Sequence, residues 1–150
     1  MKNYNALLEE IMRRGVERTG RNGTTKGLFS QQLRYDLAEG FPAVTTKELK
    51  FNAVAAELFW FMSGSSDNNK LEKLGCGIWK ANANAPYWLD RKKAKFPGDL
   101  GRIYGVQWRN WMKPDGTTVD QLKDVIERIK RDPYDRRLIV TAWNPGELEE

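Results

Sequence analysis

The feature that most constrains the fold of this chain is residues 51–62, which are apolar almost throughout. A helix that is apolar on every side is stable only when it is buried on every side. Glu57 lies in the middle of this run, between Ala56 and Leu58. We therefore expect a buried helix over 51–62 that carries one carboxylate among apolar neighbours.

That carboxylate is the first candidate for chemistry. Burying a charged group without a partner is costly, and a carboxyl group in apolar surroundings is suited to transferring protons. Two structural alternatives stay open for Glu57. Either the helix face that carries Glu57 touches solvent, or the Glu57 carboxylate forms a buried ion pair with an Arg or a Lys.

Composition describes a folded chain of moderate size. Its 150 residues are 40% hydrophobic and 30% charged, enough for one domain with a core. No apolar run approaches the roughly 18 residues of a membrane span, and the N-terminus does not resemble a signal peptide. One cysteine allows no internal disulfide and fits a reducing compartment. We expect a cytoplasmic protein.

The chain contains no histidine, which excludes several kinds of site. Catalytic triads with an imidazole base and His-containing zinc sites are absent from the sequence. Cys76 lacks a histidine to activate it, so we expect an inert thiol there. The net charge of +5 fits nucleotides, nucleic acid or other polyanions as partners, without choosing among them. We expect no metal site.

Hydrophobic periodicity and turn residues predict a mixed fold, α/β in the α+β sense, over a single domain of residues 1–150. The apolar stripe of residues 3–14 predicts an amphipathic helix. Residues 18–25 read as a polar, glycine-rich loop. We expect the remaining elements as follows: a half-buried strand over 28–37, a short helix capped by Asp67, an irregular stretch over 79–100, a helix with a buried stripe that begins at a Thr118 capping box and stops at Pro133, and a strand over 138–143.

Arg136 and Arg137 stand directly before the apolar segment 138–143. A guanidinium group cannot lose its charge, and its planar fork matches a phosphate or a carboxylate. One interpretation is that the pair binds an anionic ligand. The other is that Asp135 and a nearby Glu neutralise the two arginines at the surface.

Four further residues are weaker candidates. Arg21 lies in a loop of Gly and Thr residues whose N–H groups can approach an anion. Lys47 and Lys50 could meet a polyanion, or belong to a solvated face. The Tyr104 hydroxyl could position a water molecule, or the ring could pack in the core.

Taken together, these segments resemble the thymidylate synthase family, and the resemblance extends over essentially the whole chain. The matching blocks stand in the family's order along the sequence. They are the Arg21 loop, residues 40–47 (GFPAVTTK), 57–61 (ELFWF), 78–79 (IW), 98–109 (GDLGRIYGVQWR), 132–137 (DPYDRR) and 142–148 (AWNPGEL).

The resemblance implies the reductive methylation of deoxyuridine monophosphate (dUMP) to deoxythymidine monophosphate (dTMP). The one-carbon unit and the hydride would both come from the co-substrate 5,10-methylenetetrahydrofolate, without a metal. The family's fold has a mixed sheet with packed helices, of which this chain would be the N-terminal portion. The family forms homodimers, so a second copy of the chain is the expected partner, beside dUMP and the folate.

The resemblance also implies roles for individual residues. Arg21 would hold the nucleotide phosphate from its own subunit, and Arg136 and Arg137 would reach the phosphate of the partner subunit. Glu57 would anchor a water network that moves protons on the pyrimidine and the folate. Tyr104 would assist removal of the C5 proton through ordered water.

On the folate side, the resemblance implies a second set of residues. Ile78 and Trp79 would line the site of the pterin ring, and Trp79 would assist the late hydride transfer. Lys47 and Lys50 would face the anionic tail of the folate.

Two alternative functions stay open. A pyrimidine hydroxymethylase of the same superfamily would add water where the synthase adds hydride. A non-catalytic fragment that binds nucleic acid would use the basic, tryptophan-rich surface, and its affinity would fall steeply with salt.

The family's nucleophilic cysteine lies in a Pro-Cys-His segment that would follow Glu150, and Cys76 does not occupy its position. The sequence therefore resembles the N-terminal half of a synthase, with exposed strand edges that associate with a complementary fragment or a second copy. We expect the 150-residue chain alone to be inactive, because none of its residues is placed to attack C6 of the pyrimidine. The measurement is tritium release from dUMP labelled at C5, and release by the pure chain would contradict this expectation.

Overall fold

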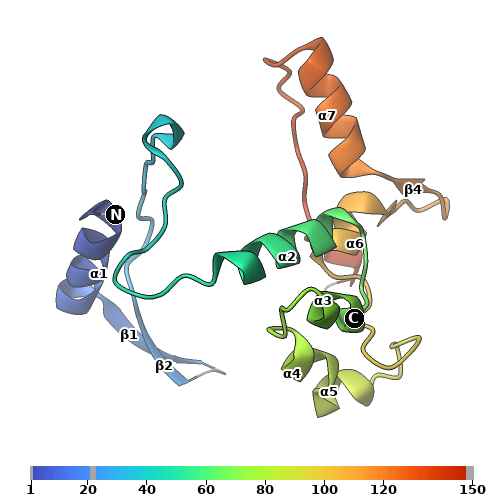
Figure 1. The fold of residues 1–150 in the computed structure, drawn as a ribbon, viewed down its shortest axis with the longest axis horizontal. Helices are drawn as coiled ribbons and strands as arrows, with labels where there is room; N and C mark the ends of the chain where they lie inside the picture. Colours follow the sequence, from blue (N-terminus) through green and yellow to red (C-terminus); the bar gives the residue numbers. More distant parts are fainter. Residues whose placement is uncertain (1, 21–22, 148–150) are drawn as a thin grey trace. The chain divides into compact units, whose positions relative to one another are not determined.

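The computed structural model describes residues 2–20 and 23–147, and these form two compact units, Met1–Leu49 and Lys50–Glu150. Helices and short antiparallel strands occur together, which confirms the mixed α/β class (Figure 1). Among the described residues, no helix is both long enough and apolar enough to cross a membrane. The expectation of a single domain over 1–150 stays a prediction.

The first unit consists of a helix and a β-hairpin. Helix α1 (Lys2–Arg14) confirms the predicted amphipathic helix. Strands β1 (Val16–Gly20) and β2 (Gly23–Gly27) pair antiparallel, with Gly20 opposite Gly23. A short 3-10 turn, η1 (Leu37–Glu39), follows, with Asp36 accepting a hydrogen bond from the Ala38 N–H.

Two sequence-based predictions for this unit are wrong. Residues 18–20 and 23–25, which belong to the segment expected as a loop, lie in the paired strands, and residues 28–37, expected as a strand, form none. Pairing across a two-residue connection has a small closure cost, so the local hairpin forms although all ten of its strand residues are exposed. The alternating segment has no partner strand in the described chain, and Phe29 on its apolar face is 97% exposed.

The second unit carries most of the helices. They are α2 (Phe51–Met62), α3 (Asn68–Lys73), α4 (Lys80–Ala83), α5 (Pro86–Leu89), α6 (Tyr104–Arg109) and α7 (Gln121–Arg131). Strands β3 (Trp111–Met112) and β4 (Thr118–Val119) pair between α6 and α7, and the 3-10 turn η2 (Pro145–Glu147) comes last. The sequence predicts an irregular stretch over 79–100, but the structure has the short helices α4 and α5 there.

The core of this unit is small and is centred on α2 and α3. Its buried apolar residues are Ala56, Trp60, Leu71, Cys76, Ala83 and Leu100. The Trp60 indole N–H donates to the Asp67 carbonyl at 3.0 Å, so the largest buried side chain of α2 is also satisfied as a donor. The predicted bounds of α2 are correct, but burial on every side is wrong: Leu58 and Phe59 are 49% and 64% exposed.

Helix caps explain where α3 and α7 begin. The Asp67 carboxylate accepts a hydrogen bond from the Asn69 N–H at 2.9 Å, as predicted. The predicted Thr118 cap is wrong, because Thr118 belongs to β4 and Asp120 caps α7 through the Lys123 N–H at 3.0 Å. The stripe expected on α7 is not fully buried either, since Ile126 and Ile129 are 42% and 46% exposed.

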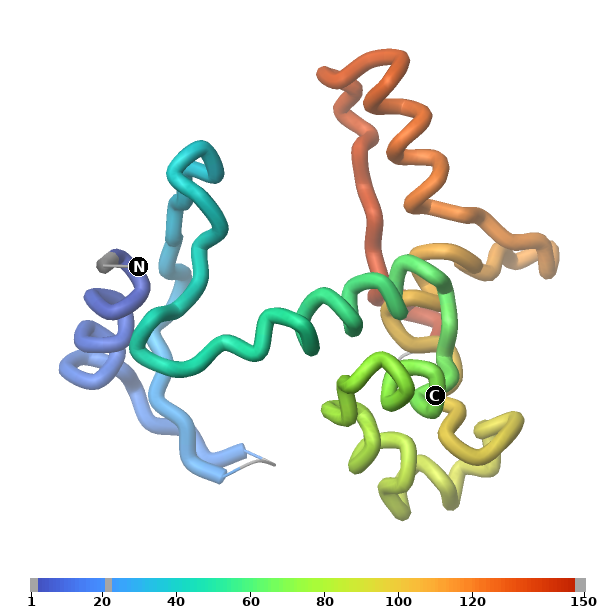
Figure 2. Tube along the Cα trace, in the orientation of Figure 1, coloured from blue at the N-terminus to red at the C-terminus, as the bar shows by residue number. Residues whose placement is uncertain are grey.

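Residues 138–143 do not form the expected strand. Figure 2 shows this segment running back from the far end of α7 toward α6. Within the described ranges it has no partner strand. Instead, the Gln121 side-chain amide pairs with the backbone of this segment. It donates to the Thr141 carbonyl at 2.9 Å and accepts from the Thr141 N–H at 3.0 Å.

Helices α2 and α6 approach each other at Gly105. A Cβ atom at this position would lie 2.5 Å from the Phe61 carbonyl oxygen and 2.7 Å from the Phe61 Cα. Both are backbone atoms, which cannot move aside as a side chain can. The missing side chain of Gly105 therefore permits the contact between the two helices.

Just beyond this contact, Arg109 joins three segments. Its guanidinium group donates to both carboxylate oxygens of Asp120, at 2.9 and 2.8 Å, and to the Met62 carbonyl at 2.5 Å. Hydrogen bonds from Arg109 hold the pKa of Asp120 below its ordinary value. The ends of α2 and α6 are thus tied to the start of α7.

We predict that Gly105→Ala destabilises the chain by about 2 kcal/mol or more, because the new methyl group forces α2 and α6 apart. Urea unfolding followed by circular dichroism measures the change. Gly77→Ala is the matched control, since a Cβ there meets nothing within 4 Å. Equal effects of the two substitutions would contradict the close approach.

Candidate functional site

An aromatic cluster covers the contact between α2 and α6. Phe61 stands at its centre, with ring centroids 5.5 Å from Tyr104, 5.6 Å from Trp108 and 6.1 Å from Trp79, all in edge-to-face geometry. Trp79 and Tyr104 also meet directly, at 6.0 Å. Edge-to-face contacts of this kind stabilise ring orientation beyond simple burial.

Glu57 reaches this cluster from α2. Its Oε1 accepts a hydrogen bond from the Trp79 indole N–H at 2.7 Å. Glu57 is half-buried and forms no ion pair with Lys or Arg in the part of the chain that the structure describes. Of the two structural alternatives for Glu57, the buried ion pair is not formed among the described residues.

Tyr104 opens α6 and is 38% exposed. Its ring packs on Phe61 and Trp79, while its hydroxyl makes no hydrogen bond to a described residue. The ring is therefore fixed in the cluster, and the hydroxyl is available to water or a ligand. The structure thus brings together the three candidate catalytic residues, Glu57, Trp79 and Tyr104.

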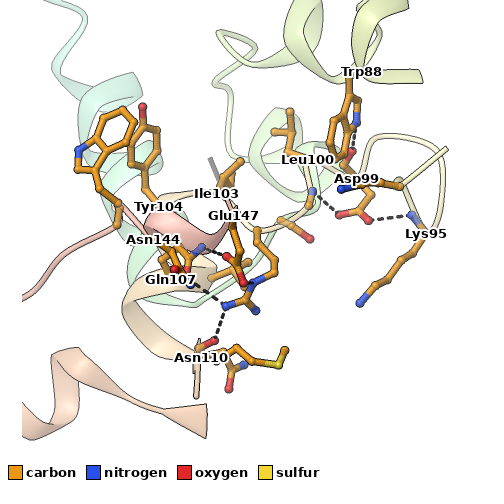
Figure 3. Close-up of a pocket in the computed structure, with 18 of the residues that line it drawn as sticks. Trp88, Lys95, Asp99, Leu100, Ile103, Tyr104, Gln107, Asn110, Asn144 and Glu147 are labelled. Atoms are coloured by element: carbon orange, nitrogen blue, oxygen red, sulfur yellow. Dashed lines mark hydrogen bonds and ion pairs between the residues drawn. The ribbon is translucent and has the colours of Figure 1, made fainter. Parts of the chain in front are cut away.

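Trp79 and Tyr104 are also part of the wall of a cavity of about 830 Å³. Two further indoles, those of Trp88 and Trp143, line the same cavity. Figure 3 shows the polar part of the wall, where Gln107, Glu147 and Asn110 lie near one another. The cavity thus combines flat aromatic surfaces with a cluster of hydrogen-bonding groups, the composition typical of a small-molecule site.

The two carboxylates of the cavity wall are held as anions. Burial raises the pKa of Glu147, but hydrogen bonds from Gln107 and Arg102 outweigh it and leave that pKa below its ordinary value. Burial likewise raises the pKa of Asp99, and hydrogen bonds from the Ser66 hydroxyl and the backbone N–H groups at 95 and 101 lower it further than burial raises it. Neither carboxylate is placed to serve as a proton donor near neutral pH.

Arg136 and Arg137 are exposed, and neither is among the described residues that line the cavity. Asp135 bonds elsewhere: its carboxylate accepts from the Arg128 guanidinium at 3.2 Å and from the Arg137 backbone N–H at 2.9 Å. These hydrogen bonds hold the pKa of Asp135 below its ordinary value. Within residues 2–20 and 23–147, neither guanidinium of the pair forms a close ion pair, although the charge of Arg137 contributes to the lowered pKa of Asp135.

The remaining predicted residues lie outside the cavity lining or outside the described residues. Arg21 lies outside the described residues. Lys47 is exposed in the first unit, whereas Lys50 and Ile78 are exposed in the second. Ile78 does not line the cavity, although its neighbour Trp79 does. The expected folate-side set is therefore represented in the cavity by Trp79 alone.

Several residues of the site were missed from the sequence. Phe61 lies one helical turn after Glu57, and that spacing could have placed it on the same face of α2. Arg102, Gln107 and Glu147 carried no local signal, because their contacts join residues 40 and 45 positions apart. Among the described side chains, no group of three or more His, Cys, Asp or Glu residues is arranged to hold a metal ion.

Comparison with protein families gives a match over nearly the whole sequence. A family model described as thymidylate synthase covers residues 2–150, and so includes both compact units.

The buried Asp99 predicts a pH dependence of stability. Because folding lowers the pKa of Asp99, its stabilising effect is complete above the ordinary aspartate value of about 3.9 and is lost as pH falls through the lowered value. We expect Asp99→Asn to cost about 2 kcal/mol at pH 7, and less as pH is lowered toward about 2.5.

Urea unfolding of both chains across this range measures the difference, with the exposed Asp90→Asn as control. A difference that stays constant with pH would contradict the role given to the Asp99 carboxylate.

Proposed function

The chain belongs to the thymidylate synthase family, and from this premise we propose that it serves the reductive methylation of dUMP to dTMP, with 5,10-methylenetetrahydrofolate as co-substrate. The single observation that carries the proposal is the meeting of Glu57, Trp79 and Tyr104 beside one aromatic cavity. These three residues come from separate segments, and their approach depends on the contact between α2 and α6.

Glu57 anchors the water molecules that move protons on the pyrimidine. One of its oxygens accepts the Trp79 indole N–H, which holds the carboxylate in a fixed orientation. The other oxygen is bonded to no described residue and is available to water. A half-buried carboxylate with one fixed and one available oxygen is suited to general acid–base work.

Tyr104 assists removal of the C5 proton through an ordered water. Its ring is held by Phe61 and Trp79, so the direction of its hydroxyl is restricted. A positioned hydroxyl that can both donate and accept a hydrogen bond can orient a water molecule without itself changing charge.

The cavity fits the flat rings of the two substrates. The co-substrate supplies both the one-carbon unit and the hydride of the reaction. Trp79, Trp88 and Trp143 give the cavity apolar aromatic walls against which a heteroaromatic ring can stack. Trp79 contacts the pterin ring together with Ile78 and assists the late hydride transfer, and Lys47 and Lys50 face the anionic tail of the folate.

Arginines bind the phosphate of the nucleotide. Arg21 serves the chain's own nucleotide, and Arg136 and Arg137 serve that of the partner subunit in a homodimer. The exposure of Arg136 and Arg137, and their lack of an ion pair with a described carboxylate, support this assignment. A dianionic phosphate would supply the close, bidentate anionic partner that this pair lacks within the described chain. The protein acts in the cytoplasm.

The hydroxymethylase alternative acts on dUMP or dCMP with the same folate, and water in place of hydride completes its reaction. Mass analysis of the product at C5 separates a methyl from a hydroxymethyl group.

A direct test of the nucleotide assignment is a thermal-shift series with dUMP and with a single-stranded oligonucleotide. We expect dUMP to raise the melting temperature, as any ligand specific for the folded state does, and Arg137→Lys to reduce that rise. Lysine keeps the charge but cannot form the bidentate contact. Arg131→Lys, on the exposed face of α7, is the matched control and should leave the rise unchanged.

Protection by the oligonucleotide alone, weakening steeply with salt, would favour the nucleic-acid-binding fragment instead.

A further inference from the structure

Helix α6, which carries Tyr104, has little stability of its own. It contains six residues, and its N-cap residue Ile103 provides no side-chain hydrogen bond to the first turn. A helix this short depends on contacts with its surroundings, and an uncapped first turn is where it opens most easily. Tyr104 occupies that first turn.

Arg102, the residue just before the cap, cannot accept hydrogen bonds from that turn, but its guanidinium group holds the helix through donated bonds. Its Nη2 donates to the Gln107 side-chain oxygen at 3.1 Å and to the Asn110 carbonyl at 3.2 Å. Gln107 lies in the second turn of α6, and Asn110 is its C-cap. One guanidinium group thus connects the residue before the helix with the carbonyl at its end.

Glu147 completes a closed ring of hydrogen bonds. Its Oε1 accepts from Arg102 Nε at 2.8 Å, and its Oε2 accepts from the Gln107 amide, which in turn accepts from Arg102. Gln107 is 2% exposed, and the side chains of Arg102 and Glu147 are 26% and 19% exposed. Figure 3 shows Gln107 and Glu147 close together on the cavity wall, and Gln107 lies on the same helix as Tyr104.

We propose that Arg102 is a positioning residue for Tyr104, which it holds against Phe61 and Trp79 by fixing the first turn of α6 through Gln107 and Glu147. This assignment rests on the proposed function for the significance of Tyr104, but its geometry is independent of any ligand. The described hydrogen bonds of the Arg102 side chain go to Glu147, Gln107 and Asn110, so its effect on the Tyr104 ring is indirect.

The requirement is for arginine and not for positive charge alone. Lysine presents one ammonium group at a single point, whereas these contacts use Nε and Nη2 of one rigid plane toward different acceptors. Arg102→Lys should therefore retain the charge opposite Glu147 while loosening the first turn.

The test uses the 150-residue chain labelled with 3-fluorotyrosine and fluorine NMR. The chain has five tyrosines, and the Tyr104 resonance is the one lost in Tyr104→Phe. We expect Arg102→Lys to shift or broaden the Tyr104 resonance by more than its linewidth, while the other four stay in place.

Glu147→Gln is the second variant, in case Arg102→Lys fails to fold. Its amide N–H₂ opposes the Gln107 donor and opens the ring, so it should change the Tyr104 resonance in the same way. Arg128→Lys is the matched control, because Arg128 also pairs with a carboxylate, that of Asp135 at 3.2 Å, but forms no side-chain hydrogen bond to α6 among the described residues.

An unchanged Tyr104 resonance in both variants would overturn the assignment, and so would an equal change in Arg128→Lys. Adding dUMP to the unsubstituted chain gives a separate answer on the proposed function. If dUMP leaves the Tyr104 resonance unmoved, the nucleotide assignment fails, while the response to Arg102→Lys still decides whether Arg102 positions Tyr104.

Discussion

The close contact between α2 and α6 is the constraint on which the site depends. Gly105 lets the backbone of α6 reach that of Phe61, and the two helices then share one aromatic cluster. Glu57 and Phe61 come from α2, while Tyr104 and Trp108 come from α6. Any residue larger than glycine at position 105 would move Glu57 on α2 away from Tyr104 on α6. Arg109 secures the same contact by joining the end of α2 to Asp120 at the start of α7.

The carboxylates in and near the cavity differ in the number of hydrogen bonds that they accept. Asp99 and Glu147 receive several donors, so their pKa values are lowered and they act as fixed anions of the scaffold. Among the described residues, Glu57 accepts a hydrogen bond only from the Trp79 indole, and its other oxygen is left for other partners. This difference in hydrogen bonding supports the proposal that Glu57, and not Asp99 or Glu147, takes part in proton transfer.

Local patterns were sufficient to predict some elements of this structure. The bounds of α2, the Asp67 cap of α3 and the end of α7 before Pro133 depend on neighbouring residues, and the structure confirms them. The strands expected at 28–37 and 138–143 are absent from the described chain because a strand needs a partner, which periodicity does not provide. Glu57, Trp79 and Tyr104 were named largely through the family resemblance. The ring of Arg102, Gln107 and Glu147 was not predicted, because it depends on contacts between residues distant in the sequence.

The central claim of the proposed function is that dUMP binds beside the aromatic cluster, with its pyrimidine near the rings of Tyr104 and of Trp79, whose indole also contacts the pterin ring. Isotope-filtered nuclear Overhauser spectroscopy on the labelled chain with unlabelled dUMP tests this most directly. The claim predicts cross-peaks between the pyrimidine C5 and C6 protons and these two rings, with the ring signals assigned through Tyr104→Phe and Trp79→Phe. Bound dUMP whose pyrimidine protons show cross-peaks only to residues outside the aromatic cluster would contradict it.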